Sequence, residues 1–350
     1  MAGAPRPQYA TRPGAPRTGA RRRPCAALPA AARGLYTARM PYDPFARRAA
    51  PARPRASRFV RERASAEGSE RDRVKEALAA RGLAPRRRFG QNFLVRPELA
   101  DRIVEHCHLK PDDVAVEIGP GAGALTGRLA SRVRALVAVE KDEGLAALLR
   151  DEAGEYPGVE IVHADFLEFD LAAVAERHGV AKLAVVGNIP YNVTTPILER
   201  LFEQRAVVRG AVLLVQKEYA ERLAAAAGTP QYGALTLFAR FHALLEPLMT
   251  IRSGAFWPRP DVDSMLVRFL LRETPPVEAP EALLFRIIRG AFHMRRKQLM
   301  NTLQESLGLS GDKIERLCRH AGVVPQRRGE TLTLEEFAKL ARSAADYVAG

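Results

Sequence analysis

The sequence of 350 residues has little cysteine, few aromatic residues and no long apolar run. Its three cysteines, Cys25, Cys107 and Cys318, lack Cys-x-x-Cys spacing, which argues against a disulfide scaffold or a structural zinc site and favours the cytoplasm. The longest apolar runs, such as 211–215 and 223–227, fall far short of the ~20 residues that cross a bilayer. Together with a mean hydropathy of -0.17, they exclude a helical membrane protein.

Acidic residues are almost absent from the N-terminal region. Residues 1–61 hold fourteen arginines, no lysine and one acid, Asp43, so they carry nearly all of the net charge of +14. We expect residues 1–68 to be a disordered extension, because they are rich in Arg, Pro and Ala and lack hydrophobic periodicity. A transit peptide, an RNA-binding arm and a translation start placed too early, with Met40 as a later start, all remain open.

From about Glu70 onward the amino-acid composition is that of an ordinary folded domain. Segments with the pattern of strands then alternate with segments that have the pattern of helices. The alternation predicts a parallel sheet covered by helices on both faces. After Thr274-Pro275-Pro276 the pattern predicts helices only. The expected helices are 71–81, 97–106, 125–131, 144–151 and 195–204, and the expected strands are 114–118, 135–139, 159–162, 183–186, 210–216 and 266–271.

Three successive predicted strands end in residues suited to a nucleoside. Gly119-Pro-Gly121-Ala-Gly123 follows the first strand, Glu140 closes the second, and Asp165 follows the third. A glycine turn lets the backbone approach a ligand, and carboxylates can accept from ribose hydroxyls or an adenine amine. Each feature also has a simpler explanation when taken alone. The glycine turn could serve packing only, and each of the two acids could cap a helix. No phosphate-binding Gly-x-x-x-x-Gly-Lys-Ser/Thr motif occurs.

The fourth strand of the alternation leads into Asn188-Ile189-Pro190-Tyr191. The Asn188 oxygen can accept from an amino group, Pro190 stiffens the turn, and Tyr191 offers a face on which a base can stack. An ordinary Asn-x-Pro turn would explain the first two features but not the tyrosine. The segment therefore suggests a clamp for the amine of a nucleobase.

Glu117-Ile-Gly-Pro-Gly-Ala-Gly123, Glu140, Asp165 and Asn188-Ile-Pro-Tyr191 resemble the S-adenosylmethionine and target-amine motifs of the N6-adenine methyltransferases. Arg88-Phe-Gly-Gln-Asn-Phe-Leu94, Phe256-Trp-Pro-Arg-Pro-Asp-Val-Asp-Ser264 and Phe292-His-Met-Arg-Arg-Lys-Gln-Leu299 narrow the resemblance to the small-subunit ribosomal RNA adenine dimethyltransferases, over about residues 86–344. The resemblance implies an α/β fold in which a Rossmann-like class I methyltransferase domain, here 69–273, precedes a small all-helical RNA-binding domain, here 274–350. It also implies N6,N6-dimethylation of two adjacent adenosines in the 3′-terminal hairpin loop of small-subunit rRNA, late in subunit biogenesis.

The resemblance further implies S-adenosylmethionine as methyl donor, the small-subunit rRNA or a subunit precursor as partner, no membrane partner and a monomeric protein. Asn188 and the main chain around Ile189 and Pro190 would hold the target amine, while Tyr191 stacks on the adenine. Ile189 stands where many members have leucine, but only its main chain would matter. The donor contacts carried over are Asn92, Leu94, Gly119, Glu140, Asp165 and Asn188.

Basic runs are the expected RNA contacts, because the chain beyond residue 61 has a net charge of only +1. They are Arg86, Arg87 and Arg88, then Arg295, Arg296 and Lys297, with Arg327 and Arg328 as a further pair. His106-Cys107-His108 suggests a metal ligand set at first sight. However, adjacent side chains on a helix diverge and no other ligands accompany them, so we expect no metal.

Three other functions remain open at this point. A large-subunit rRNA dimethyltransferase of the macrolide-resistance type shares the Gln-Asn-Phe-Leu and Asn-Ile-Pro-Tyr segments, although the Arg295–Lys297 run and 328–337 resemble the small-subunit branch more. A non-catalytic ribosome assembly or transcription factor could keep the same fold. A DNA adenine methyltransferase would usually carry a second proline where Ile189 stands.

Overall fold

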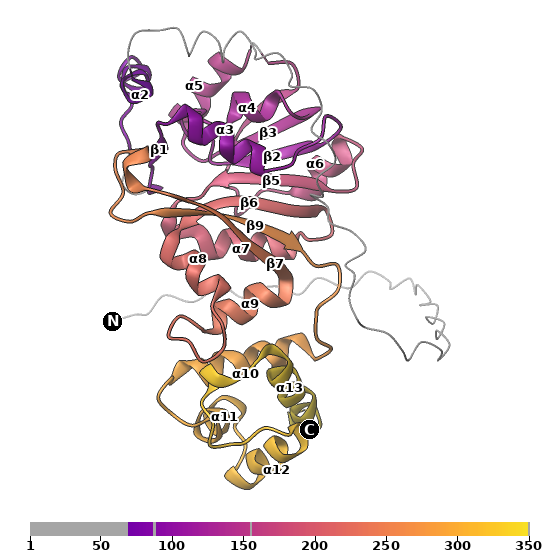
Figure 1. Ribbon diagram of the computed structural model, residues 1–350. Coiled ribbons are helices and arrows are strands. Elements are labelled where there is room, and N and C mark those ends of the chain that lie inside the picture. Colours follow the sequence, from indigo (N-terminus) through magenta and orange to yellow (C-terminus); the bar gives the residue numbers. More distant parts are fainter. Residues whose placement is uncertain (1–68, 87–88, 155, 349–350) are drawn as a thin grey trace, which may run out of the picture. The chain divides into compact units, whose positions relative to one another are not determined.

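The computed structural model describes residues 69–86, 89–154 and 156–348. The predicted extension 1–68, with Cys25 and Met40, lies outside the described residues, as do Arg87 and Arg88. A seven-stranded sheet in the order β4-β3-β2-β5-β6-β9-β7 forms the centre of the fold (Figure 1). Its strands are β2 (Val114–Ile118), β3 (Ala135–Glu140), β4 (Val159–His163), β5 (Leu183–Asn188), β6 (Val208–Gln216), β7 (Ala243–Ile251) and β9 (Ser264–Leu271).

Five neighbouring strands, from β4 to β6, are parallel as the sequence predicts, but the sheet as a whole is mixed. β9 lies between β6 and β7 and pairs with both in the antiparallel sense. The prediction of a parallel sheet is therefore wrong for this edge. The segment 252–263 that joins β7 to β9 contains no crossover helix, and such a connection returns the chain antiparallel.

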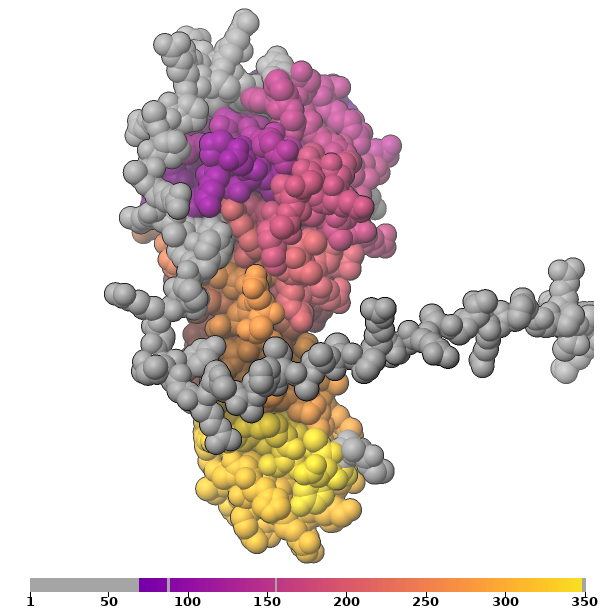
Figure 2. Space-filling view, turned by 90° about the vertical axis from the view of Figure 1, so that its right-hand side faces the viewer, coloured from indigo at the N-terminus to yellow at the C-terminus, as the bar shows by residue number. Residues whose placement is uncertain are grey.

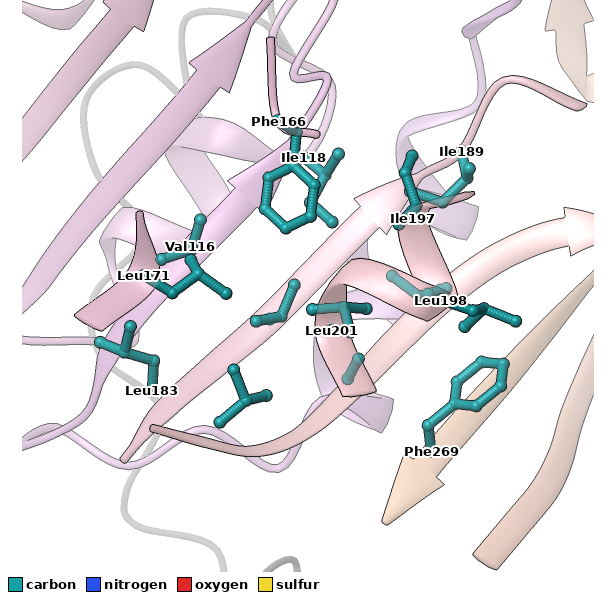
Figure 3. Packing of buried hydrophobic residues seen from close by; sticks show 14 of the residues in the cluster. Val116, Ile118, Phe166, Leu171, Leu183, Ile189, Ile197, Leu198, Leu201 and Phe269 are labelled. Carbon is teal, nitrogen blue, oxygen red and sulfur yellow. The ribbon is translucent and has the colours of Figure 1, made fainter. Parts of the chain in front are cut away.

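Helices cover both faces of the sheet. The pleat sends alternate apolar side chains of β2, β3 and β5 to opposite faces, which separates two groups of buried residues. One face packs against α6 (Leu171–Arg177), α7 (Thr194–Glu203), α8 (Lys217–Ala224) and α9 (Ala234–His242). Figure 3 shows the part of this contact made by Leu171 of α6 and by Ile197, Leu198 and Leu201 of α7. The other packs against α2 (Glu70–Ala79), α3 (Pro97–His106), α4 (Thr126–Ala130) and α5 (Glu143–Ala153).

The region after β9 is helical, as predicted. Its helices are α10 (Glu281–His293), α11 (Leu299–Leu307), α12 (Gly311–Ala321) and α13 (Leu334–Val348), with the short η4 (Gly329–Thr331). They bury a core of their own, and Figure 2 shows the outer surface of this region in orange and yellow. Three residues from around α9 join that core: Tyr232, Leu237 and Phe241. The Tyr232 hydroxyl donates to the Leu332 carbonyl at 2.7 Å.

A second, two-stranded sheet joins distant parts of the chain. β1 (Phe93–Leu94) pairs antiparallel with β8 (Phe256–Trp257), which follows the short η3 (Ser253–Ala255). The rings of Phe93 and Trp257 stack with their centroids 6.3 Å apart. This pairing fixes the segment before α3 beside the edge of the large sheet at which β2, β3 and β5 end.

Candidate active site

A cavity of about 270 Å³ lies at the carboxyl ends of the parallel strands. It collects residues from the segment before α3, from the turns after β2, β3 and β4, and from the turn after β5. All the donor and target residues expected from the sequence line this one cavity: Asn92, Leu94, Gly119, Glu140, Asp165, Asn188, Ile189, Pro190 and Tyr191.

The glycine turn after β2 brings the backbone close to its neighbours. Gly121 has a φ of +60°, which favours glycine, and a Cβ there would lie 3.1 Å from the Phe93 ring. Its amide donates to Glu140 Oε2 at 3.0 Å. The turn therefore needs glycine for contact with the protein itself as well as for an approaching ligand.

Glu140 is held by two main-chain amides. Its Oε2 accepts from Gly121 N, and its Oε1 accepts from Asp142 N at 2.9 Å. Burial raises the pKa of Glu140, and the hydrogen bonds from these amides act in the opposite direction. Each carboxylate oxygen can accept more than one hydrogen bond, so the fixed carboxylate can still accept from ribose hydroxyls.

Asp165, just beyond β4, has partners at both oxygens. Oδ1 accepts from Leu167 N at 3.0 Å, and Oδ2 accepts from Lys141 Nζ at 2.5 Å. Partial burial raises the pKa of Asp165, but the Lys141 ammonium and the Leu167 amide outweigh it, so the pKa lies below its ordinary value. Asp165 is therefore ready to accept as an anion.

Asn188 ends β5 with its side-chain amide in a defined orientation. Nδ2 donates to the main-chain carbonyl of Asn92 at 3.1 Å, which leaves Oδ1 as the group that can accept from a ligand. In the next turn, the Pro190 carbonyl accepts from Val193 N and from Thr194 Oγ1. No residue that the structure describes donates to the Ile189 carbonyl, so it is the open main-chain acceptor of this turn.

Tyr191 begins the short η2 (Tyr191–Val193) and is anchored at its hydroxyl. The hydroxyl shares a hydrogen bond of 3.0 Å with Ser264 Oγ at the start of β9, and Ser264 itself is buried. Burial raises the pKa of Tyr191, with the Ser264 hydrogen bond acting against it. The anchor fixes the ring at the cavity wall, where one face can meet a planar group.

Glu117, the one charged residue of β2, begins the donor motif found in the sequence, but sequence reasoning gave it no role of its own. Glu117 is 2% exposed and lines the cavity, and its Oε2 has no hydrogen-bond partner. Burial raises its pKa to about 8; the Thr126 hydroxyl acts against this shift, and the Glu140 carboxylate adds to it. A carboxylate inside an otherwise apolar strand was the signal that could have found it.

The expected RNA-binding arginines differ in their surroundings. Arg86 contacts Asp142 at 2.9 Å, and Arg295 donates to the carbonyls of Pro230 and Tyr232. Arg296 and Lys297 are exposed and form no ion pair with any residue described.

The structure also bears on metals and membranes. Within residues 69–86, 89–154 and 156–348, no three His, Cys, Asp or Glu side chains are grouped so as to hold a metal ion. None of the helices described in those ranges is both long and apolar enough to cross a membrane.

Comparison with known proteins decides the family. The model of the ribosomal RNA adenine dimethylase family matches residues 82–346. The chain belongs to this family. The ribosomal RNA small subunit methyltransferase A of Geobacillus kaustophilus is 42% identical over 279 residues, covering 78% of this chain and 95% of the relative. The ribosomal RNA small subunit methyltransferase A of Geobacter metallireducens is 42% identical over 268 residues, covering 76% of this chain and 98% of the relative.

Two solved structures share the fold of the dimethylase family. A dimethyladenosine transferase from Plasmodium falciparum has a TM-score of 0.59 and 22% identity, covering 72% of this chain and 96% of its own. The 23S rRNA methyltransferase ErmE has a TM-score of 0.55 and 28% identity, covering 72% and 99%. These likenesses confirm a Rossmann-like methyltransferase fold with a C-terminal helical region.

Members of the dimethylase family use S-adenosylmethionine as methyl donor, and the cavity fits this molecule. Glu140 can accept from its ribose hydroxyls, and Asp165 from its adenine amine. The unpartnered Glu117 Oε2 lies in the cavity wall, and the ammonium or sulfonium of a bound donor would favour the ionised form of this carboxyl group.

Proposed function

We propose that the protein dimethylates the N6 amines of two adjacent adenosines in the 3′-terminal hairpin loop of small-subunit rRNA. Its partner is the small ribosomal subunit or its precursor, late in biogenesis, and it works as a cytoplasmic monomer. Residues 69–273 carry the chemistry and residues 274–350 contact RNA. The orientation of the Asn188 amide carries this proposal, because Nδ2 is held by Asn92 and Oδ1 is left to accept from an amine.

The chemistry follows from two open acceptors. The lone pair of an adenine N6 amine is delocalised into the ring, so the amine is a poor nucleophile. When Asn188 Oδ1 and the Ile189 carbonyl accept its two hydrogens, the nitrogen becomes more tetrahedral and its lone pair is freed for attack. S-adenosylmethionine, when bound, supplies the electrophilic methyl group. The nitrogen–carbon bond forms in line as the methyl–sulfur bond breaks, and the methylated nitrogen then releases a proton to water. This transfer requires orientation more than a strong base, so the site needs no histidine or lysine beside Asn188.

The same acceptors account for a second methyl group. A monomethylated amine has one hydrogen left, and either acceptor can take it while the other faces the methyl group. Tyr191, anchored by Ser264, can stack on the adenine, which must leave its own stack to reach the cavity. A single-stranded loop is a substrate in which this displacement costs little.

Identity supports small-subunit rRNA over the alternative substrates. The chain is 42% identical to small-subunit methyltransferases and 28% identical to the 23S rRNA enzyme. Retention of Glu140, Asp165 and Asn188 together argues against a non-catalytic factor. For RNA contact we propose mainly Arg296 and Lys297, since Arg86 and Arg295 have partners within the protein.

Methyl transfer to isolated ribosomal subunits tests the proposal. Small subunits that lack dimethyladenosine, large subunits and duplex DNA would each receive labelled S-adenosylmethionine with wild-type protein or with Asn188→Ala. Nuclease digestion and mass spectrometry would locate the product. We expect N6,N6-dimethyladenosine near the 3′ end of the small-subunit RNA with the wild type, and almost none with the variant.

Each other result would point elsewhere. Transfer to large subunits alone would favour the macrolide-resistance type of enzyme, and transfer to DNA alone a DNA methyltransferase. Binding of small subunits without transfer to any substrate would favour an assembly factor. Free RNA and partly assembled subunits, compared in the same assay, would show which form is the substrate.

A further inference from the structure

Asp142, two residues beyond β3, has a task for each carboxylate oxygen. Its side chain is 3% exposed, and its Oδ1 caps α5 by accepting from Gly144 N at 3.0 Å and Leu145 N at 3.3 Å. This is ordinary helix capping, for which aspartate and asparagine serve about equally well. The second oxygen faces away from the helix and takes part in a different contact.

Asp142 Oδ2 contacts two side chains from the segment before α3. Arg86 Nη1 lies 2.9 Å away, and Gln91 Nε2 donates to Oδ2 at 3.3 Å. Gln91 Oε1 in turn accepts from Arg86 N at 2.7 Å, so the three residues form a closed set of contacts. Gln91 therefore donates to a buried carboxylate that also forms an ion pair with Arg86, and a hydrogen bond to a charged acceptor is stronger than a neutral one.

Gln91 belongs to a strap, residues Phe89–Leu94, that lines the cavity on both its donor and its target side. On the donor side, the Phe93 ring covers Gly121, so closely that a Cβ there would lie 3.1 Å away. On the target side, a Cβ at Gly90 would lie 3.3 Å from Pro190 Cβ. The Asn92 carbonyl, also in the strap, orients the Asn188 amide.

We propose that Asp142 is a positioning residue that fixes the strap over the methyl-donor site through Oδ2. Since the strap also orients Asn188, Asp142 acts on the target side through the same contacts. The inference rests on the proposed function, because it concerns binding of the methyl donor. Asp142 itself is absent from the cavity wall, so it acts through Gln91 and Arg86.

Asp142→Asn separates the two tasks. Asparagine keeps an oxygen that can cap α5. Its Nδ2, however, is a hydrogen-bond donor, so it cannot accept from Arg86 or Gln91, whose side chains are donors as well. Arg86→Met removes one contact from a half-exposed side chain and leaves the cap untouched. Asp170→Asn is the matched control, because Asp170 Oδ1 caps α6 in the same way and Asp170 has no contact with the strap.

Calorimetric titration with S-adenosylhomocysteine, the product form of the donor, measures the effect without RNA. We expect Asp142→Asn to raise the Kd about tenfold, Arg86→Met to raise it about threefold, and Asp170→Asn to leave it within twofold. The melting temperature of free Asp142→Asn should match that of Asp170→Asn. The double variant that combines Asp142→Asn with Arg86→Met should bind no more weakly than Asp142→Asn alone, because both substitutions remove the contact between Arg86 and Asp142.

An unchanged Kd in Asp142→Asn, or effects that add in the double variant, would overturn the inference. A Kd that rises only in step with a lower melting temperature would also overturn it, because that is the mark of a purely structural role. If the wild type itself fails to bind S-adenosylhomocysteine, the proposed function fails. If the wild type binds S-adenosylhomocysteine and the variants bind it equally well, only the role of Asp142 is refuted.

Discussion

The donor side and the target side of one cavity are built differently. On the donor side, both oxygens of Glu140 and both oxygens of Asp165 already accept from amides or from Lys141. On the target side, Asn188 Oδ1 and the Ile189 carbonyl remain open acceptors. With the proposed function, the two carboxylates Glu140 and Asp165 are organised by the protein itself, Glu117 excepted, whereas the RNA would complete the target site.

Asn188→Ala should cause the largest effect and should separate the two sides. Removing an acceptor used in the transition state should lower kcat about a thousandfold, the upper end of the range for one lost hydrogen-bonding group. The Kd for S-adenosylhomocysteine should rise less than about tenfold. Single-turnover methylation and calorimetry would measure both, with Asn301→Ala, at an exposed position of α11, as the control. A loss found mainly in the Kd would place Asn188 on the donor side.

Glu140→Gln tests how completely the donor side is organised. A glutamine has one oxygen, so its side-chain nitrogen would face the amide of either Gly121 or Asp142. We expect the Kd for S-adenosylhomocysteine to rise about a hundredfold, or about 2.7 kcal/mol. The control is Glu160→Gln on the neighbouring strand β4, which disturbs only a surface ion pair with Arg177 of α6. Equal affinities for these two variants would contradict the comparison.

Tyr191 separates stacking from anchoring on the target side. Tyr191→Leu should lower kcat/KM for rRNA about tenfold, because stacking on a base is worth about 1–3 kcal/mol. Tyr191→Phe keeps the ring and loses only the bond to Ser264, so the decrease should stay within about threefold. Steady-state methylation of small subunits would measure both. If the two variants lose the same activity, the hydroxyl and not the ring is what matters.

The smallest expected effect comes from Glu117, which lines the cavity, and it is a dependence of the free energy of unfolding on pH. With a pKa of about 8 in the folded protein and 4.5 ordinarily, Glu117 holds its proton when folded and loses it when unfolded over this range. The free energy of unfolding should therefore fall as pH rises from about 5 to 8. Glu117→Gln mimics the protonated form and should remove at least about 1 kcal/mol of this fall. Urea titrations at several pH values would measure it, and parallel curves for the two proteins would refute it.

The sequence predicted the strands and strand ends that make the cavity. Runs such as Val114–Ile118 and Leu183–Asn188 are apolar because both faces of the sheet are covered, and that pattern is visible without a structure. The residues that end them meet at one edge because parallel strands end together. Strand β7 escaped prediction because it is a half-exposed edge strand that contains Pro247.

Partners far apart in sequence could not be predicted. Nothing in the run 86–88 shows that Arg86 contacts Asp142, and nothing in Arg295-Arg296-Lys297 shows that only the first of the three donates to Pro230 and Tyr232. The pairing of Asp165 with Lys141 and the anchoring of Tyr191 by Ser264 also depend on the tertiary fold. Motifs give the residue types of a site, whereas the fold decides which of them are free to bind.

The pairing of β1 with β8 sets an order of events during synthesis. A ribosome makes Phe93 more than 160 residues before its partner Trp257, and Tyr191 long before Ser264. A nascent chain that stops short of residue 256 has the glycine turn and both donor acids, but it lacks the strand that holds Leu94 in place. We therefore expect the ability to bind the methyl donor to arise late in translation, once β8 and β9 have emerged.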